Sequence, residues 1–85
     1  MDKKFAWNAL KSKRLKLIRG VSFEEIVKAK FIEAIAHPSR PNQQVIVYEH
    51  KGYFWAVPCV ETEDKIFLKT IYPSRKLLKR FKKEI

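Results

Sequence analysis

The spacing of apolar residues changes from a helical period to a period of two near residue 43, and this change most constrains the fold. Three runs with the shorter period occupy residues 45–50, 53–57 and 65–72. Gly52 lies between the first two runs, which predicts a tight β-hairpin, and residues 61–64 predict a second turn before the third strand. Pro58 interrupts the second run and predicts a bulge or a sheet edge there.

Two helices are expected ahead of these strands. Asn8 is a good N-cap for the first helix, and Gly20 stands where a left-handed residue is favoured after its end. At 100° per residue, the large apolar side chains of this helix share one stripe, which we expect to face the core: Trp7, Leu10, Leu17 and Ile18. Arg14 lies on the same stripe and predicts either a side chain over the edge of the core or a guanidinium in a groove beside the sheet.

Residues 22–25, Ser-Phe-Glu-Glu, form a capping-box sequence, so a second helix is expected from residue 22 to about residue 30. Residues 5–7 predict a short edge strand, residues 31–36 a further strand and residues 75–85 a basic helix. Helices grouped before a meander indicate an α+β fold with a small antiparallel sheet. At 85 residues the chain is short enough for one domain over residues 1–85.

The charge is concentrated at the two ends of the chain. Of 19 basic and 9 acidic residues, residues 1–20 carry seven bases and one acid, and residues 73–85 carry six bases and one acid. The middle is nearly neutral, and the net charge is +10. Such a field attracts phosphate backbones or an acidic protein surface. We therefore expect a nucleic acid or an acidic protein as partner.

Several site types are not predicted. Cys59 is the one cysteine and, in its apolar run, indicates a buried small side chain. His37 and His50 lack the partner spacing of a zinc motif and are interpreted as loop and exposed turn residues. No paired-carboxylate or glycine-rich phosphate-loop pattern is present, so we expect no metal and no cofactor. No signal peptide or membrane span is recognisable, which predicts a cytoplasmic protein.

The two ends of the chain resemble a known family. Phe5, Trp7 and Asn8, a basic helix, and then Arg-Gly-Val-Ser-Phe-Glu-Glu at residues 19–25 resemble the opening of BrnT-like toxins. These typically begin F-x-W-D/N, continue with a lysine-rich helix and then show H/R-G-V/I-S-F-E-E. Residues 67–75 and the basic helix after them resemble the family's final strand, turn and basic tail. The resemblance covers nearly the whole chain.

This resemblance implies a RelE-superfamily fold and a ribonuclease or translation-blocking toxin of a type II toxin–antitoxin system. It also implies an acidic antitoxin, usually of the ribbon-helix-helix type, whose complex with the toxin binds operator DNA. Carried over by residue, it makes Arg75, Lys69 and Arg80 the expected catalytic residues. The family's serine then falls on Pro73 and its strand arginine on Thr70, beside Lys69.

Cleavage of RNA by its own 2′-hydroxyl needs proton transfer and neutralisation of a charged phosphorane, and it needs no metal. The residues expected to bind the RNA are basic or aromatic: Lys11, Arg14, Arg40, Tyr72, Lys76 and Lys79. Two alternatives remain: a non-catalytic nucleic-acid-binding module, and an inactive relative that acts as an antitoxin corepressor. Charge reversal at Arg75 separates a toxin from a binder, because a binder loses only one phosphate contact.

Overall fold

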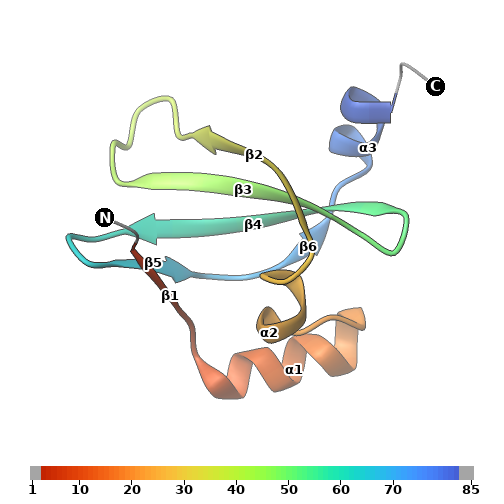
Figure 1. Ribbon diagram of the computed structural model, residues 1–85, viewed down its shortest axis with the longest axis horizontal. Helices are drawn as coiled ribbons and strands as arrows, with labels where there is room; N and C mark the ends of the chain where they lie inside the picture. Colours follow the sequence, from red (N-terminus) through yellow and green to blue (C-terminus); the bar gives the residue numbers. More distant parts are fainter. Residues whose placement is uncertain (1–2, 83–85) are drawn as a thin grey trace.

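The computed structural model describes residues 3–82, the last two by their backbone alone (Figure 1). The elements in chain order are β1 (Lys4–Ala6), α1 (Ala9–Arg19), α2 (Phe23–Ile26), β2 (Lys30–Ala36), β3 (Gln43–His50), β4 (Tyr53–Glu61), β5 (Lys65–Leu68), β6 (Tyr72–Pro73) and α3 (Arg75–Lys82). The α+β class, the β3–β4 hairpin and the strand over 31–36 are confirmed. The part of the closing helix expected beyond residue 82 lies outside the described residues.

The sheet is mixed, so the prediction of a purely antiparallel sheet is wrong. The strand order is β1-β5-β4-β3-β2, with β6 also pairing β4. The antiparallel meander is present, but β1 pairs β5 in parallel. β1 lies at the end of the strand order, on the side of β5 that does not pair with β4, so it is the edge strand that residues 5–7 predict. Its direction was not readable from three residues.

Pro58 interrupts the hydrogen bonding of β4 on one side and leaves its pairing with β3 on the other side regular. The pairing of β4 with β3 runs from residue 53 to residue 60 without a shift, so there is no bulge between these two strands. On its other side, β4 pairs with β5 at residues 59–61 and with β6 at residues 55–56, so Pro58 lies at a local gap in the sheet. There the carbonyl of Pro58 accepts from the backbone N–H of Lys69 at 2.8 Å. Because proline has no N–H to return, the ladder is interrupted there. The predicted strand over 65–72 is accordingly split into β5 and β6.

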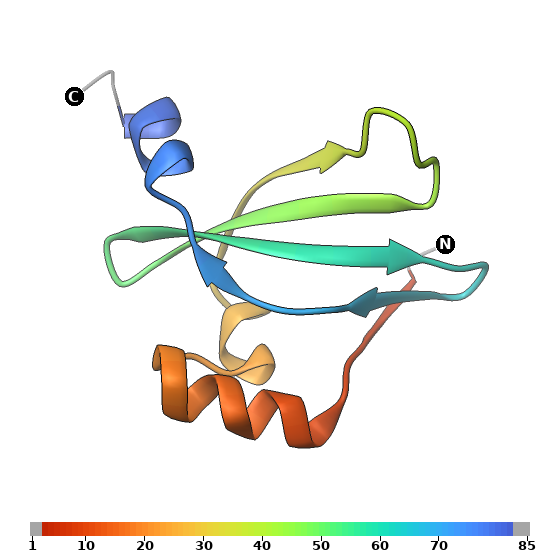
Figure 2. The same cartoon turned by 180° about the vertical axis from the view of Figure 1, so that it is seen from behind.

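Helices cover the two faces of the sheet differently (Figures 1 and 2). On one face, here called the α1 face, Leu15 of α1 and Phe23 and Ile26 of α2 pack on the sheet in the main core. On the other, here called the α3 face, Leu77 of α3 packs in a smaller cluster with side chains of β3 and β4. Cys59 is buried in the main core as predicted, and burial raises the pKa of its thiol to about 11.

The predicted helix ends are confirmed on α1. The Asn8 side chain accepts from the N–H of Lys11, and Gly20 adopts a φ of 81°. The capping box of Ser22 and Glu25 is present as well. However, α2 is one turn long, because backbone bonds between residues three apart tighten the chain at residues 28 and 29 and end the helix before β2.

Trp7, the first residue of the predicted stripe, is half-buried against the main core. The three members within α1 face solvent, so the predicted orientation of the helix is wrong. Leu10, Leu17 and Ile18 are 71%, 86% and 64% exposed, and the buried residues of the helix are Ser12 and Leu15. Arg14 is exposed with the stripe, away from any groove beside the sheet. The hydroxyl of Ser12 decides the orientation, because it accepts from the buried backbone N–H of Phe23 at 2.9 Å and donates to Glu24.

Candidate functional site

Alternate residues of β4 hold the segment between β5 and α3 in a line. The backbone N–H of Lys69 donates to the carbonyl of Pro58, and that of Ser74 donates to the carbonyl of Phe54. Between these two bonds, Tyr72 pairs with Ala56. Residues 54 and 58 are four apart, so the two ends of this line are separated by about 13 Å at the strand rise of ~3.3 Å per residue. Lys69 lies at one end of this line, and Arg75 directly follows the other end.

The side chains along this line are accessible. Lys69 and Arg75 are exposed, and Tyr72 is 39% exposed. Paired residues of neighbouring strands share a face, so Tyr72 lies on the same face as Ala56, which packs against Leu77 of α3. The line therefore borders the α3 face of the sheet.

Ser74 positions the start of α3. Its hydroxyl accepts from the N–H of Leu77 at 3.2 Å, as an N-cap does, and its carbonyl accepts from the N–H of Leu78. Arg75 is thereby fixed as the first helical residue, next to the end of β6. The buried Leu77 anchors the helix, and Lys76 and Lys79 remain exposed. The result is a basic helix held at one end of the line.

Phe67 adds an aromatic side chain that the sequence analysis did not select. It pairs with Val60 of β4 and is 41% exposed. Val60 is four residues from Ala56 on the same strand, so both side chains lie on the same face of the sheet. Phe67 and Tyr72 therefore lie on the same face of the sheet, at either end of the gap between β5 and β6. The alternation of Phe67 with Ile66 and Leu68 was the signal that could have placed it outside the core.

The other predicted site residues do not join this group. Arg80 lies 3.9 Å from the carboxylate of Glu33 on β2, toward the opposite edge of the sheet from β5. Lys11 and Arg14 lie on α1, which covers the other face (Figure 1). Arg40 is in the loop between β2 and β3. The structure thus brings together Lys69, Tyr72, Arg75 and the first turns of α3, and separates the rest.

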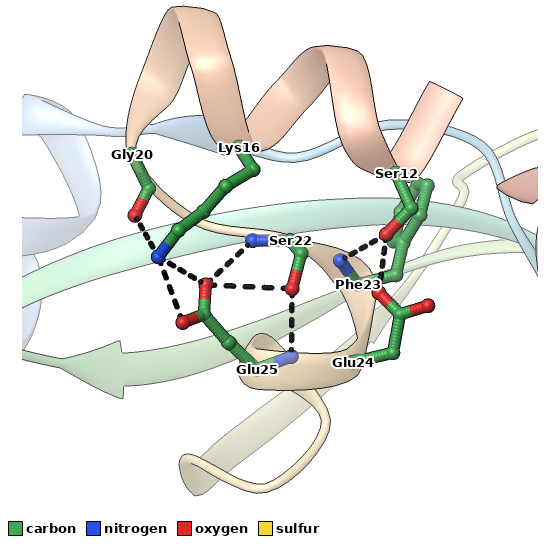
Figure 3. Close-up of polar contacts among 7 residues, drawn as sticks. All are labelled: Ser12, Lys16, Gly20, Ser22, Phe23, Glu24 and Glu25. Atoms are coloured by element: carbon green, nitrogen blue, oxygen red, sulfur yellow. Dashed lines mark hydrogen bonds and ion pairs between the residues drawn. The ribbon is translucent and has the colours of Figure 1, made fainter. Parts of the chain in front are cut away.

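The Ser-Phe-Glu-Glu motif builds a polar junction between α1 and α2 (Figure 3). Glu24 accepts from the Ser12 hydroxyl and the Trp7 indole, and Glu25 pairs with Lys16 at 2.8 Å. The bond from Ser12 is the main reason that the pKa of Glu24 is lowered. Lys16, followed by the Ser22 backbone, lowers the pKa of Glu25 to about 2. Both carboxylates are ionised at neutral pH, so they suit a structural role better than that of a general acid.

The two histidines have different surroundings. Nδ1 of His37 accepts from the N–H groups of Ser39 and Arg40, both at 3.1 Å, which makes it part of an ordinary loop, as interpreted. His50 is half-buried, and its Nε2 is buried without a hydrogen-bond partner among residues 3–82, so the interpretation as an exposed turn residue is wrong. The Trp55 indole, which donates to the His50 carbonyl, helps to hold this end of the hairpin.

Within the described part of the chain, no three His, Cys, Asp or Glu side chains gather where they could hold a metal ion. None of the helices described is long and apolar enough to cross a membrane.

Comparison with known proteins gives one informative match. No family model matches the sequence, and no curated protein matches it. Among solved structures, the fold is similar to the 1.1 Å crystal structure of the Brucella abortus ribonuclease toxin, BrnT. The TM-score is 0.55 and the sequence identity 16%, over 86% of this chain and 97% of that one. The chain therefore has a BrnT-like fold, as the resemblance of its two ends predicts.

Proposed function

We propose that this protein is a metal-independent endoribonuclease, the toxin of a type II toxin–antitoxin system in the RelE superfamily. The observation that carries the proposal is the line of Lys69, Tyr72 and Arg75 along β4, at the start of a basic helix. The likeness of the fold to that of a ribonuclease toxin supports the same class of activity. On this proposal the substrate is single-stranded RNA in the cytoplasm.

The proposed reaction is attack of a ribose 2′-oxygen on the adjacent phosphorus. The 2′-hydroxyl gives its proton to solvent water, the bond to the 5′-oxygen breaks, and that oxygen takes a proton from solvent. The products therefore carry a 2′,3′-cyclic phosphate and a 5′-hydroxyl. Negative charge grows on the phosphorane oxygens, and preorganised cations at Arg75 and Lys69 stabilise that charge. Tyr72 and Phe67 offer rings on which an unpaired base stacks. Lys76 and Lys79 hold the flanking phosphates.

The remaining predicted residues have lesser roles in this proposal. Arg80, paired with Glu33, positions α3 and contributes charge from a distance. Lys11, Arg14 and Arg40 add to the long-range positive field and do not contact the cleaved phosphate. The net charge of +10 also favours an acidic antitoxin, of the ribbon-helix-helix type in this proposal, through which the pair binds operator DNA.

Growth of a bacterial host after tightly induced expression tests this proposal, with and without the gene encoded next to this one. We expect growth arrest that the neighbouring gene relieves, and loss of arrest in Arg75→Ala and Lys69→Ala. Lys28→Ala is the matched control, because Lys28 is an exposed base between α2 and β2. Normal growth with soluble wild-type protein would contradict the toxin and favour the non-catalytic binder or the corepressor.

A further inference from the structure

The apolar stripe of α1 has no partner in the fold as described. Of the stripe's apolar members, Trp7 packs on the main core, whereas Leu10, Leu17 and Ile18 are each more than half exposed. Arg14 lies at their centre, three residues before Leu17 and four before Ile18, so the four side chains form one continuous strip. Contiguous apolar surface of this kind on a small domain marks an interaction site.

The exposed side chains of Leu10, Leu17 and Ile18 are not needed to hold α1 in the fold. The helix is held to the sheet by Leu15 and to α2 by Ser12, both on its other side. Single exposed apolar residues are ordinary on protein surfaces, whereas three aligned on one helix face are a binding pattern used by helical partners.

A hollow beside the stripe adds a second, independent feature. It has a volume of about 400 Å³ and lies between α1 and α2. Its lining residues are Ser12, Lys13, Lys16, Leu17, Ser22 and Glu24. Leu17 belongs both to the stripe and to this hollow, so a side chain inserted there extends the same contact surface.

The charge around the stripe indicates which kind of partner binds there. Five of the eleven residues of α1 are basic, and none is acidic. A second copy of the chain would bring like charges together. RNA offers phosphates and base rings, which leave leucine and isoleucine without a matching contact. A flat lipid surface does not fill a hollow beside a helix. An acidic helix with one apolar face matches the stripe and the basic side chains Lys13 and Arg14. Because Glu24 also lines the hollow, the side chain that enters it is an apolar one.

We propose that the stripe and the hollow are the docking site for an acidic amphipathic helix of a protein partner. Its apolar residues cover Leu10, Leu17 and Ile18, one of them enters the hollow, and its carboxylates meet Lys13 and Arg14. This site lies on α1 and α2, which cover the α1 face, whereas α3, which begins at Arg75, lies on the other side of the sheet (Figure 2). It goes beyond the proposed function, because it holds a partner without covering the cleavage site.

The test uses a fluorescent, designed helical peptide with leucines along one face and glutamates elsewhere. Its binding to the full chain is measured by anisotropy beside three other probes. These are a peptide of the same composition in scrambled order, vesicles of anionic lipid, and a single-stranded RNA oligonucleotide. The variant is Leu17→Ser with Ile18→Ser. The control is Phe31→Ser, which removes another exposed apolar side chain, 58% exposed, from β2.

We expect the amphipathic peptide to bind, and the double variant to weaken that binding about tenfold or more, equivalent to ~1.4 kcal/mol. Phe31→Ser should leave it unchanged, and the double variant should melt like the wild type. Because Phe31→Ser loses an edge contact with the ring of Tyr48, binding is measured at a temperature at which melting curves show every variant folded. Equal binding of the scrambled peptide, preference for vesicles, loss in the control, or no peptide binding would each overturn the proposal. RNA cleavage by the double variant is measured separately, so failure of the docking site and failure of the ribonuclease are distinguishable.

Discussion

The two basic helices α1 and α3 have similar sequence patterns and opposite orientations. In α3 the apolar residue Leu77 is buried against the sheet, and bases such as Lys76 and Lys79 face solvent. In α1 the apolar residues Leu17 and Ile18 face solvent. An amphipathic pattern therefore indicates that one face of a helix makes apolar contacts. It does not show whether those contacts are with the protein's own sheet or with another molecule.

The attachment of the two helices differs for the same reason. α3 is attached mainly by apolar contacts of Leu77 and Leu78, and Arg80 lies 3.9 Å from the carboxylate of Glu33. α1 is attached by Leu15 together with a polar junction through Ser12 and Lys16, in which hydrogen bonds set the rotation of the helix. Directional bonds of this kind can outweigh the tendency of an apolar stripe to turn inward, since a buried N–H without a partner is costly.

Truncating one leucine on each helix gives the largest expected difference. Leu77→Ala should lower the free energy of unfolding by about 2 kcal/mol or more, because it leaves a cavity against the sheet. Leu17→Ala should change it by less than about 0.5 kcal/mol, as exposed substitutions usually do. Urea unfolding of both variants measures the difference. Equal losses would mean that α1 does not expose its stripe.

Removing the Ser12 hydroxyl tests the polar junction. Ser12→Ala leaves the buried N–H of Phe23 without its acceptor and Glu24 without its donor, so we expect a loss of about 1 to 2 kcal/mol in the free energy of unfolding. Ser39→Ala, in the exposed loop after β2, is the matched control and should be neutral. A neutral Ser12→Ala would show that apolar packing alone orients α1.

RNA binding should depend on α3 more than on α1. Lys76→Ala or Lys79→Ala should weaken binding of a single-stranded oligonucleotide a few-fold, and should reduce the slope of log K against log salt by about 0.7. Lys13→Ala on α1 should leave that slope unchanged. A titration of each variant at several salt concentrations provides the values. Equal changes in slope for the α1 and α3 variants would mean that the RNA contacts both faces of the sheet.

Acid should loosen α1 before α3. The pKa of Glu25 is lowered to about 2 by its pairing with Lys16, so the folded state favours the ionised carboxylate. The stabilisation is present above the unfolded pKa near 4.5 and is lost as pH falls from there toward 2. Hydrogen exchange at α1 amides should therefore rise over this window, and Glu25→Gln should flatten the response. Equal acceleration in α3 would contradict this account.

Local sequence signals predicted the local structure well. Asn8, Gly20 and the capping box of residues 22–25 act through bonds to residues a few positions away, and all three are present. The hairpin at Gly52 is of the same kind, because the turn determines its register.

Features that depend on distant contacts were predicted less well. The parallel pairing of β1 joins residues about sixty positions apart, and the interruption beside Pro58 appears on a different strand from the proline. The rotation of α1 depends on Ser12 meeting residues 23 and 24. At the site, Lys69 and Arg75 were selected through a family resemblance, and their shared position along β4 comes from pairing that the sequence alone did not reveal.

Cleavage of a single-stranded RNA in the presence of EDTA tests whether the protein is a metal-independent ribonuclease, with Arg75→Ala compared to Arg14→Ala. Both variants remove one exposed arginine, one from α3 and the other from α1. We expect products with 2′,3′-cyclic phosphate ends, a loss of about 100-fold or more in rate for Arg75→Ala, and little change for Arg14→Ala. Absence of cleavage by the wild type, or equal losses in the two variants, would contradict a ribonuclease site on the α3 face.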